Sequence, residues 1–278
     1  MITKEDIQNQ MIQAVETVKR TNPMAGSITN TVTINFVANA QLAVGGSAAM
    51  VYLPDEGEFL AKAGGATYIN VGTLLTIYEQ TLPHTAKTLH DMEKPWVLDP
   101  VAVGIGSLRT QLLQQFKEYK PSVIRGNASE IIALAGLWEL DGGTDVSNVR
   151  GVDSTDSVST AKAAAVALAK WTGGAVAVSG KTDLITDGSV IAISHGGSHF
   201  MEKITGSGCS LGGVVAVYAT ATSPFIAALT ATAVYNLAGA RAGNKVDGPG
   251  SFQVQFLDEL YKATAADIGN NPFEIEEV

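Results

Sequence analysis

Strand and helix patterns alternate along most of this chain, and that alternation constrains its fold more than any other feature. Seven short runs have the apolar or β-branched character of strands: Ser47–Tyr52, Ala66–Val71, Trp96–Leu98, Ser122–Arg125, Ala175–Ser179, Leu184–Thr186 and Val190–Ser194. Helical periodicity occupies the segments between and around them: residues 3–18, Thr31–Val44, Glu56–Ala63, Leu75–Met92, a stretch from Ala128, Thr160–Trp171, and stretches from about Ser207, Pro224 and Ser251. The pattern predicts a three-layer α/β fold, a mostly parallel central sheet flanked by helices.

The domain organisation follows from the same pattern. The three strands clustered between Ala175 and Ser194 are too close together for helical crossovers, so they predict an antiparallel edge. No linker and no internal repeat interrupts the chain, and we expect residues 1–278 to form a single domain.

In sheets of this kind, ligands bind beyond the carboxyl ends of the strands. The segments that follow predicted strands are therefore the places to look for chemistry: Val71-Gly72-Thr73, Asp99-Pro100, Arg125-Gly126-Asn127 and Ser179-Gly180.

Charge and composition exclude several classes of function. The formal charge of the 278 residues is −9 and no basic run occurs, which argues against nucleic-acid binding. Polar residues and Pro224 interrupt the most apolar stretch, Leu211–Ala242, so we expect two buried helices there and no membrane span. Cys209 is the only cysteine and residues 1–20 lack the apolar core of a signal peptide, so we expect a cytoplasmic protein.

The sequence Gly206-Ser207-Gly208-Cys209 opens a long apolar helix. Glycines at a helix start allow successive N–H groups to face one anion, although an ordinary loop-to-helix turn explains the pattern equally well. Two interpretations are open for Cys209 as well. A single free cysteine is most often a buried core residue, but at a helix N-terminus the thiolate is stabilised and is able to accept a proton.

Asp99, Arg125 and Glu130 are candidates for holding phosphate and magnesium. Arg125 suits phosphate, and Glu130 suits a metal or its waters, yet Asn127 with Glu130 three residues later also has the pattern of a capping box. Asp99, after a fully apolar strand, suits magnesium or a water but is equally able to cap a turn.

The segment Ser179-Gly180-Lys181-Thr182 is similar to the end of a phosphate-binding P-loop, but the preceding glycine, Gly174, is one residue too far away. The residues between them have the pattern of a strand, so we reject a P-loop and retain Ser179 as a phosphate contact. The four histidines lack the spacing of helical metal ligands, and His195 to His199 are expected in a surface turn between strands.

Taken together, the motifs resemble the hydroxyethylthiazole kinases, thiamin-salvage enzymes of the ribokinase-like family, over nearly the whole chain. The resemblance rests on the order and spacing of these segments: Ile28-Thr29-Asn30, Asn35-Phe36-Val37-Ala38-Asn39, Asn70-Val71-Gly72-Thr73-Leu74, Leu98-Asp99-Pro100-Val101, Arg125-Gly126-Asn127-Ala128-Ser129-Glu130-Ile131, Gly151-Val152-Asp153-Ser154, Thr205-Gly206-Ser207-Gly208-Cys209 and Gly248-Pro249-Gly250-Ser251-Phe252.

The resemblance implies a ribokinase-like fold, a homotrimer with active sites near subunit interfaces, and ATP- and magnesium-dependent phosphorylation of the hydroxyl of 4-methyl-5-(2-hydroxyethyl)thiazole. It also implies a set of roles. The thiazole site would contain Met50, Asn30, Gly72 and Gly206; ATP would contact Arg125, Ser179 and Gly208; Asp99 and Glu130 would organise Mg²⁺; and Cys209 would be the catalytic base.

Two segments depart from the family pattern. The histidine that usually precedes the Ile-Thr-Asn motif is missing from Met24-Ala25-Gly26-Ser27, and Ala102-Val103 is inserted before Gly104 where the family has Asp-Pro-Val-Gly. Three alternatives remain: a ribokinase-like kinase for another alcohol such as hydroxymethylpyrimidine, an inactive relative that binds thiazole or nucleotide as a sensor, and a dinucleotide-dependent oxidoreductase. The retained Asp99, Glu130 and Cys209 count against the sensor, and the missing glycine fingerprint counts against the oxidoreductase.

Overall fold

A single nine-stranded sheet runs through the molecule. The computed structural model describes residues 3–144 and 157–278. The strands are β1 Met24–Ile28, β2 Ser47–Met50, β3 Ala66–Asn70, β4 Trp96–Asp99, β5 Val123–Asn127, β6 Ala175–Ser179, β7 Asp183–Thr186, β8 Val190–Ser194 and β9 Phe273–Glu277. Their spatial order is β2-β1-β3-β4-β5-β6-β7-β8-β9. Pairing is parallel from β2 through β6 and antiparallel from β6 through β9, which confirms the predicted antiparallel edge.

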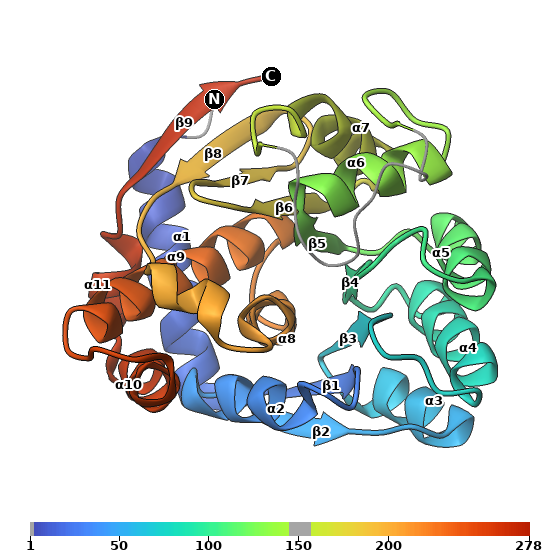
Figure 1. The fold of residues 1–278 in the computed structure, drawn as a ribbon, viewed down its shortest axis with the longest axis horizontal. Helices are drawn as coiled ribbons and strands as arrows, with labels where there is room; N and C mark the ends of the chain where they lie inside the picture. The colour runs from blue at the N-terminus through green and yellow to red at the C-terminus, as the bar shows by residue number, and fades with distance from the viewer. Residues whose placement is uncertain (1–2, 145–156) are drawn as a thin grey trace.

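Helices cover both faces of this sheet, as predicted. They are α1 Lys4–Thr21, α2 Ile34–Ala43, α3 Pro54–Ala63, α4 Tyr78–Asp91, α5 Ser107–Tyr119, α6 Ala128–Leu137, α7 Lys162–Thr172, α8 Ser207–Ala219, α9 Pro224–Gly243, α10 Pro249–Lys262 and α11 Ala265–Gly269, with a 3₁₀ helix, η2, at His199–Lys203. In Figure 1, α3 to α7 lie on one side of the sheet and α1, α2 and α8 to α11 on the other. A separate apolar core fills each of the two interfaces.

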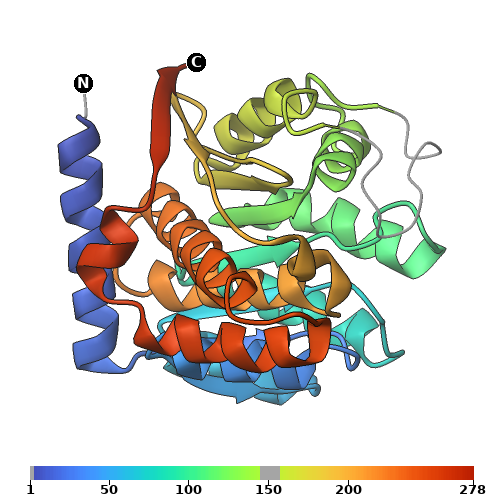
Figure 2. The same cartoon turned by 60° about the vertical axis from the view of Figure 1, so that its left-hand side comes forward.

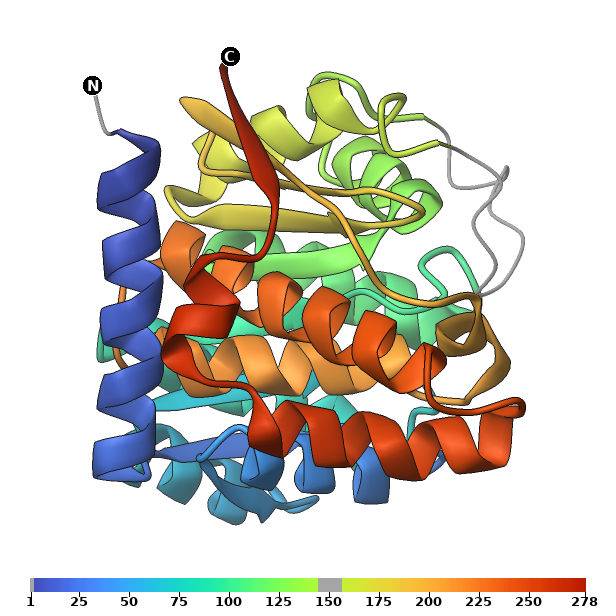
Figure 3. The same cartoon turned by 90° about the vertical axis from the view of Figure 1, so that its left-hand side faces the viewer.

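Helix α8 lies in the middle of its layer. It contacts β1, β3, β4 and β5 on one side and α2 and α9 on the other, and Figure 3 shows α8, α9 and α10 as neighbouring layers beside the upright α1. Every residue of α8 from Ser210 to Ala219 is buried, which explains why its sequence is apolar around the whole helix. Nothing in the described ranges forms a helix long and apolar enough to cross a bilayer. Both chain ends lie at the same end of the molecule in Figure 2.

Five elements of the described residues were not predicted: β1, α5, η2, α11 and β9. The residues Met24-Ala25-Gly26-Ser27-Ile28 of β1 are mostly small and lack the β-branched and aromatic side chains typical of strands. Strand β9 alternates acidic and apolar residues because it is the edge strand and pairs only with β8. The His195 segment was predicted to connect two strands, but it leads from β8 into η2.

Candidate functional site

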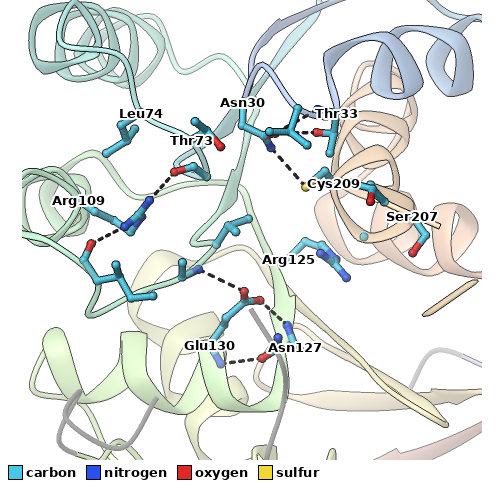
Figure 4. Close-up of a pocket in the computed structure, with 18 of the residues that line it drawn as sticks. Asn30, Thr33, Thr73, Leu74, Arg109, Arg125, Asn127, Glu130, Ser207 and Cys209 are labelled. Atoms are coloured by element: carbon cyan, nitrogen blue, oxygen red, sulfur yellow. Dashed lines mark hydrogen bonds between the residues drawn. The ribbon is translucent and has the colours of Figure 1, made fainter. Parts of the chain in front are cut away.

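The carboxyl ends of β1, β3, β4, β5 and β6 meet at one edge of the sheet, opposite the N-terminus of α8. A cavity of about 1110 Å³ opens there, as expected for a parallel sheet. Its wall includes these residues from the sequence analysis: Asn30, Gly72, Arg125, Glu130, Gly206, Gly208 and Cys209. Figure 4 shows the labelled side chains entering this space from both the sheet edge and the helix. The motif Gly151-Val152-Asp153-Ser154 lies outside the described residues.

Arg125 connects two strand ends beneath the cavity. Its Nη2 donates to Ser179 Oγ at 3.0 Å, and its Nη1 lies 3.5 Å from Asp99 Oδ2. Asp99 is fully buried below the cavity wall, and burial raises the pKa of its carboxyl although the nearby Arg125 charge opposes that shift. The prediction that Asp99, Arg125 and Ser179 lie together at one edge of the sheet is therefore confirmed.

Glu130 forms the predicted capping box with Asn127. Asn127 Oδ1 accepts from the Glu130 N–H at 2.9 Å, and Glu130 Oε2 accepts from the Asn127 N–H at 2.8 Å. Glu130 Oε1 also accepts from the Ala102 N–H at 3.4 Å. Glu130 is buried as well as being part of the cavity wall, so the capping and functional interpretations share this residue. Burial, reinforced by the negative charge of Asp99, raises the pKa of Glu130 from 4.5 to about 7.

Because this pKa is raised, the free energy of unfolding is expected to depend on pH. Between pH 4.5 and about 7 the folded protein holds a proton on Glu130 that the unfolded chain has lost, so stability falls as the pH rises through that interval. The contribution is on the order of 3 kcal/mol. Glu130→Gln removes it, and denaturant unfolding at pH 5 and pH 8 should show the variant gaining stability relative to the parent at pH 8. An unfolding free-energy difference that is equal at both pH values would contradict this account.

Helix α8 begins with a glycine-rich turn, as its sequence indicated. Gly206 is the N-cap residue with φ +94°, a conformation that side chains disfavour, and the helix starts at Ser207. A Cβ on Gly208 would lie 2.7 Å from Arg125 Nη1, so only glycine lets the guanidinium approach the first turn this closely. A cation and the N–H groups of a helix N-terminus consequently lie side by side, which suits an anionic phosphate.

Cys209 lies in the cavity wall on the first turn of α8, and Asn30 Nδ2 donates to its Sγ at 3.5 Å. Burial and the Asp99 charge raise the pKa of the Cys209 thiol, although Arg125 opposes the shift. Burial therefore acts against the thiolate that the helix N-terminus is expected to stabilise.

Asn30 and Gly72 lie together, as the resemblance implied. Asn30 Nδ2 donates to Asn70 Oδ1 at 3.0 Å, and the Gly72 N–H donates to the same oxygen at 2.9 Å. Asn30 Oδ1 accepts from the Thr33 N–H at 3.1 Å, so residues before Ile34 form a turn and α2 starts later than the predicted Thr31. Met50, by contrast, ends β2 at the sheet edge and is not among the cavity-lining residues of the described chain.

Sequence reasoning gave no role to Arg109, Tyr68 or Asn70. Arg109 of α5 donates from Nε to the Val71 carbonyl at 2.8 Å and from its Nη atoms to the Gly72 and Ile105 carbonyls, and it lines the cavity. No signal marked it, because α5 itself was not predicted. Tyr68 and Asn70 are two positions apart on β3, and this period of two places both side chains on one sheet face.

A second cavity of about 650 Å³ adjoins the first. It lies between the β6–β7 turn, the segment before η2, and helices α8 and α9. The two cavities share Arg125, Glu202, Ser207 and Gly208. Ser179 lies in its wall at the end of β6. The residues between Gly174 and Ser179 form that strand, which is consistent with rejecting a P-loop.

The described ranges contain no group of three or more His, Cys, Asp and Glu side chains arranged to hold a metal. The carboxylates nevertheless fit a magnesium ion shared with substrate phosphates, which needs only one or two protein carboxylates. Asp99 Oδ1 is buried without a hydrogen-bond partner in the structure. Ala102 in the segment after Asp99 has φ +58°, the left-handed conformation that glycine favours and alanine rarely adopts.

A family model and individual relatives of known sequence identify the same family for this chain. The model of the hydroxyethylthiazole kinase family matches residues 15–266. A hydroxyethylthiazole kinase from Bifidobacterium longum is 50% identical over 288 aligned positions, which cover 97% of this chain and 92% of that relative. Another from Leptospira interrogans is 42% identical over 252 positions, covering 90% of this chain and 92% of the relative.

Solved structures agree with the sequence relatives. A hydroxyethylthiazole kinase from Pyrococcus horikoshii superposes with a TM-score of 0.84 at 28% identity, covering 97% of this chain and 99% of that one. A ribokinase-like superfamily protein from Enterococcus faecalis has a TM-score of 0.61 at 12% identity, covering 94% and 95% respectively, which shows a shared fold. The predicted ribokinase-like architecture is thereby confirmed.

Proposed function

This chain belongs to the hydroxyethylthiazole kinase family, and we propose how its site carries out the reaction of that family. The reaction is ATP-dependent phosphorylation of the hydroxyl of 4-methyl-5-(2-hydroxyethyl)thiazole, a step of thiamin salvage. The observation that carries the proposal is the meeting of Arg125, Cys209 and the α8 N-terminus around one cavity. A cation and an anion-binding turn there face a candidate base.

We propose that the two adjoining cavities divide the substrates between them. ATP occupies the second cavity, where it contacts Ser179 and directs its terminal phosphate toward Arg125 and Gly208 at the junction. The thiazole alcohol occupies the main cavity beside Asn30 and Gly72. Phosphoryl transfer depends chiefly on alignment and on neutralising charge, so a shared wall of cationic and N–H groups is the feature it needs.

In the proposed reaction, Cys209 accepts the proton of the hydroxyethyl group as its oxygen attacks the terminal phosphorus. Arg125 and the N–H groups at Gly206 and Gly208 stabilise the charge on the transferring phosphoryl group. The Asn30 amide, which donates to Cys209 Sγ, orients the thiol toward the acceptor and favours its thiolate. Burial and the Asp99 charge raise the pKa of the thiol, and the Arg125 charge and the Asn30 hydrogen bond partly offset that rise.

We propose that Asp99 and Glu130 hold Mg²⁺, together with oxygens of the nucleotide phosphates. A bound magnesium ion supplies positive charge that offsets the charge of the phosphates. Asp99 Oδ1 has no hydrogen-bond partner among the described residues, which supports this role. Glu130 lines the cavity, and its two backbone N–H partners fix the direction of its carboxylate.

Three further properties belong to the proposal. Homotrimerisation would bring Met50 of the edge strand β2 to the active site of a neighbouring copy, and the exposed Val32 at the cavity rim supports an interface there. One sheet takes strands from residues 24 to 277, which supports a single kinase domain over 1–278.

The single cysteine supports a cytoplasmic location. Light scattering of the purified protein would determine the oligomeric mass.

The assignment is tested with a substrate panel. Purified protein with magnesium and ATP is supplied in parallel with hydroxyethylthiazole and hydroxymethylpyrimidine, and ADP formation is measured. We expect turnover of the thiazole alone. Turnover of the pyrimidine alone would assign the site to the other alcohol, and nucleotide binding without turnover of either would support the sensor alternative.

A further inference from the structure

The mechanism leaves the buried hydroxyl of Tyr68 without a role. Tyr68 is fully buried, and its hydroxyl donates to Asp99 Oδ2 at 2.9 Å while accepting from Asn70 Nδ2 at 2.9 Å. Strand register places Asn70 opposite Asp99 on the neighbouring strand, so the three side chains meet at the sheet edge. Tyr68 is thus the direct neighbour of a carboxylate to which we have assigned magnesium.

Hydrogen-bond directions in this cluster are fixed by a backbone group. The Gly72 N–H is necessarily a donor, so the Asn70 atom that it contacts at 2.9 Å is the amide oxygen. The amide nitrogen of Asn70 must then face Tyr68, and the only proton of the phenol is left for Asp99. On its other side, Asn70 Oδ1 accepts from Asn30, whose nitrogen also contacts Cys209. A continuous path of hydrogen bonds therefore joins Asp99 to Cys209.

The ring of Tyr68 also spaces the sheet from helix α8. A Cβ on Gly212 would lie 2.4 Å from Tyr68 Cε2, so the helix backbone rests on the ring at that point. Gly212 is one turn after Cys209 on the same helix face. The same side chain therefore supports both the phosphate side of the site, through Asp99, and the acceptor side, through α8.

We propose that Tyr68 and Asn70 are positioning residues for the kinase reaction. Tyr68 holds Asp99 Oδ2 and leaves Oδ1 without a hydrogen-bond partner among the described residues, and Asn70 holds Asn30 and Gly72 on the alcohol side. This inference rests on the proposed function. The two residues act on different substrates, so their variants have different kinetic signatures.

Tyr68→Phe keeps the ring that packs on Gly212 and removes only the hydroxyl. We expect kcat to fall about tenfold, with the Mg²⁺ concentration for half-maximal rate raised several-fold and the KM for the thiazole within twofold of the parent. Asn70→Ala should raise the KM for the thiazole more than Tyr68→Phe does and change the magnesium requirement less, because Asn70 contacts Asn30 and Gly72 as well as the Tyr68 hydroxyl.

A binding measurement separates positioning from general damage. Calorimetric titration of the ligand-free protein with ADP, with and without magnesium, should show Tyr68→Phe weakening only the magnesium-dependent binding, by about tenfold. Tyr78→Phe is the matched control, because Tyr78 is equally buried and its hydroxyl donates to the Thr29 carbonyl at 2.9 Å. It should lose comparable stability and keep the parent's kcat and ADP affinities.

Equal weakening of both ADP titrations by Tyr68→Phe, or a magnesium-dependent affinity within twofold of the parent, would overturn the inference. Failure of the proposed function gives a different result. In that case the parent protein does not phosphorylate the thiazole, while the ADP titrations still decide whether Tyr68 positions Asp99.

Discussion

Replacement of Arg125 by lysine is expected to lower kcat by about 10²–10³-fold. The variant is expected to remain folded. Arg125 contacts Ser179 Oγ and approaches Asp99 Oδ2 with different nitrogens, and its guanidinium lies against the Gly208 backbone. A lysine keeps the positive charge beside Asp99 but has one ammonium group, so it is unable to make these contacts together and face a phosphate. Steady-state kinetics at saturating ATP and thiazole measure the effect.

Two companion variants make this result specific. Ser179→Ala removes one partner of Arg125 and leaves its charge and its Asp99 contact, so the loss of kcat should be smaller, within about tenfold. Arg125→Ala leaves the buried Asp99 carboxylate without its ion pair, and a loss of about 3–5 kcal/mol in unfolding free energy is expected. A kcat for Arg125→Lys within threefold of the parent would exclude Arg125 from phosphoryl stabilisation.

Replacement of Cys209 by alanine is expected to lower kcat by about 10²-fold, the lower limit for removing a general base. Cys209→Asp should retain at least the parent's kcat at pH 7. The reason is that the thiol pKa is raised by burial and Asp99, so little thiolate is present at neutral pH, whereas a carboxylate ionises far more readily. A Cys209→Ala variant with full kcat would contradict the role of base and leave the kinase assignment intact.

The pH dependence gives an independent test of the same role. A base acts in its deprotonated form, and the folded protein raises the pKa of this thiol above its ordinary value. The kcat of the parent should consequently rise with pH from 7 to 9. The kcat of Cys209→Asp should be nearly constant over that interval. Because Cys209 is the only cysteine, its thiolate fraction is measurable by thiol alkylation at each pH. Alkylation and kcat should rise together in the parent.

Local patterns in the sequence were sufficient to predict most of the architecture and the position of the site. Alternating strand and helix periods indicated a parallel sheet, and polar residues directly after apolar strands indicated its active edge. Glycines at Gly206 and Gly208 and a capping pair at Asn127 and Glu130 are short-range signals, and the structure contains both features. Strand β1 was missed because its small residues carry no propensity signal.

The chemistry of individual groups depended on contacts between distant residues. Burial and the Asp99 charge raise the pKa of Cys209, but Asp99 and Cys209 are far apart in the chain and meet only in the folded protein. The path from Asp99 through Tyr68, Asn70 and Asn30 likewise requires three strands to be in register. The sequence by itself determined which elements form and which edge carries the reactive side chains, because periodicity and turn residues act locally. Only the tertiary structure decided the charge states and hydrogen-bond directions, because desolvation and pairing are set by neighbours in space.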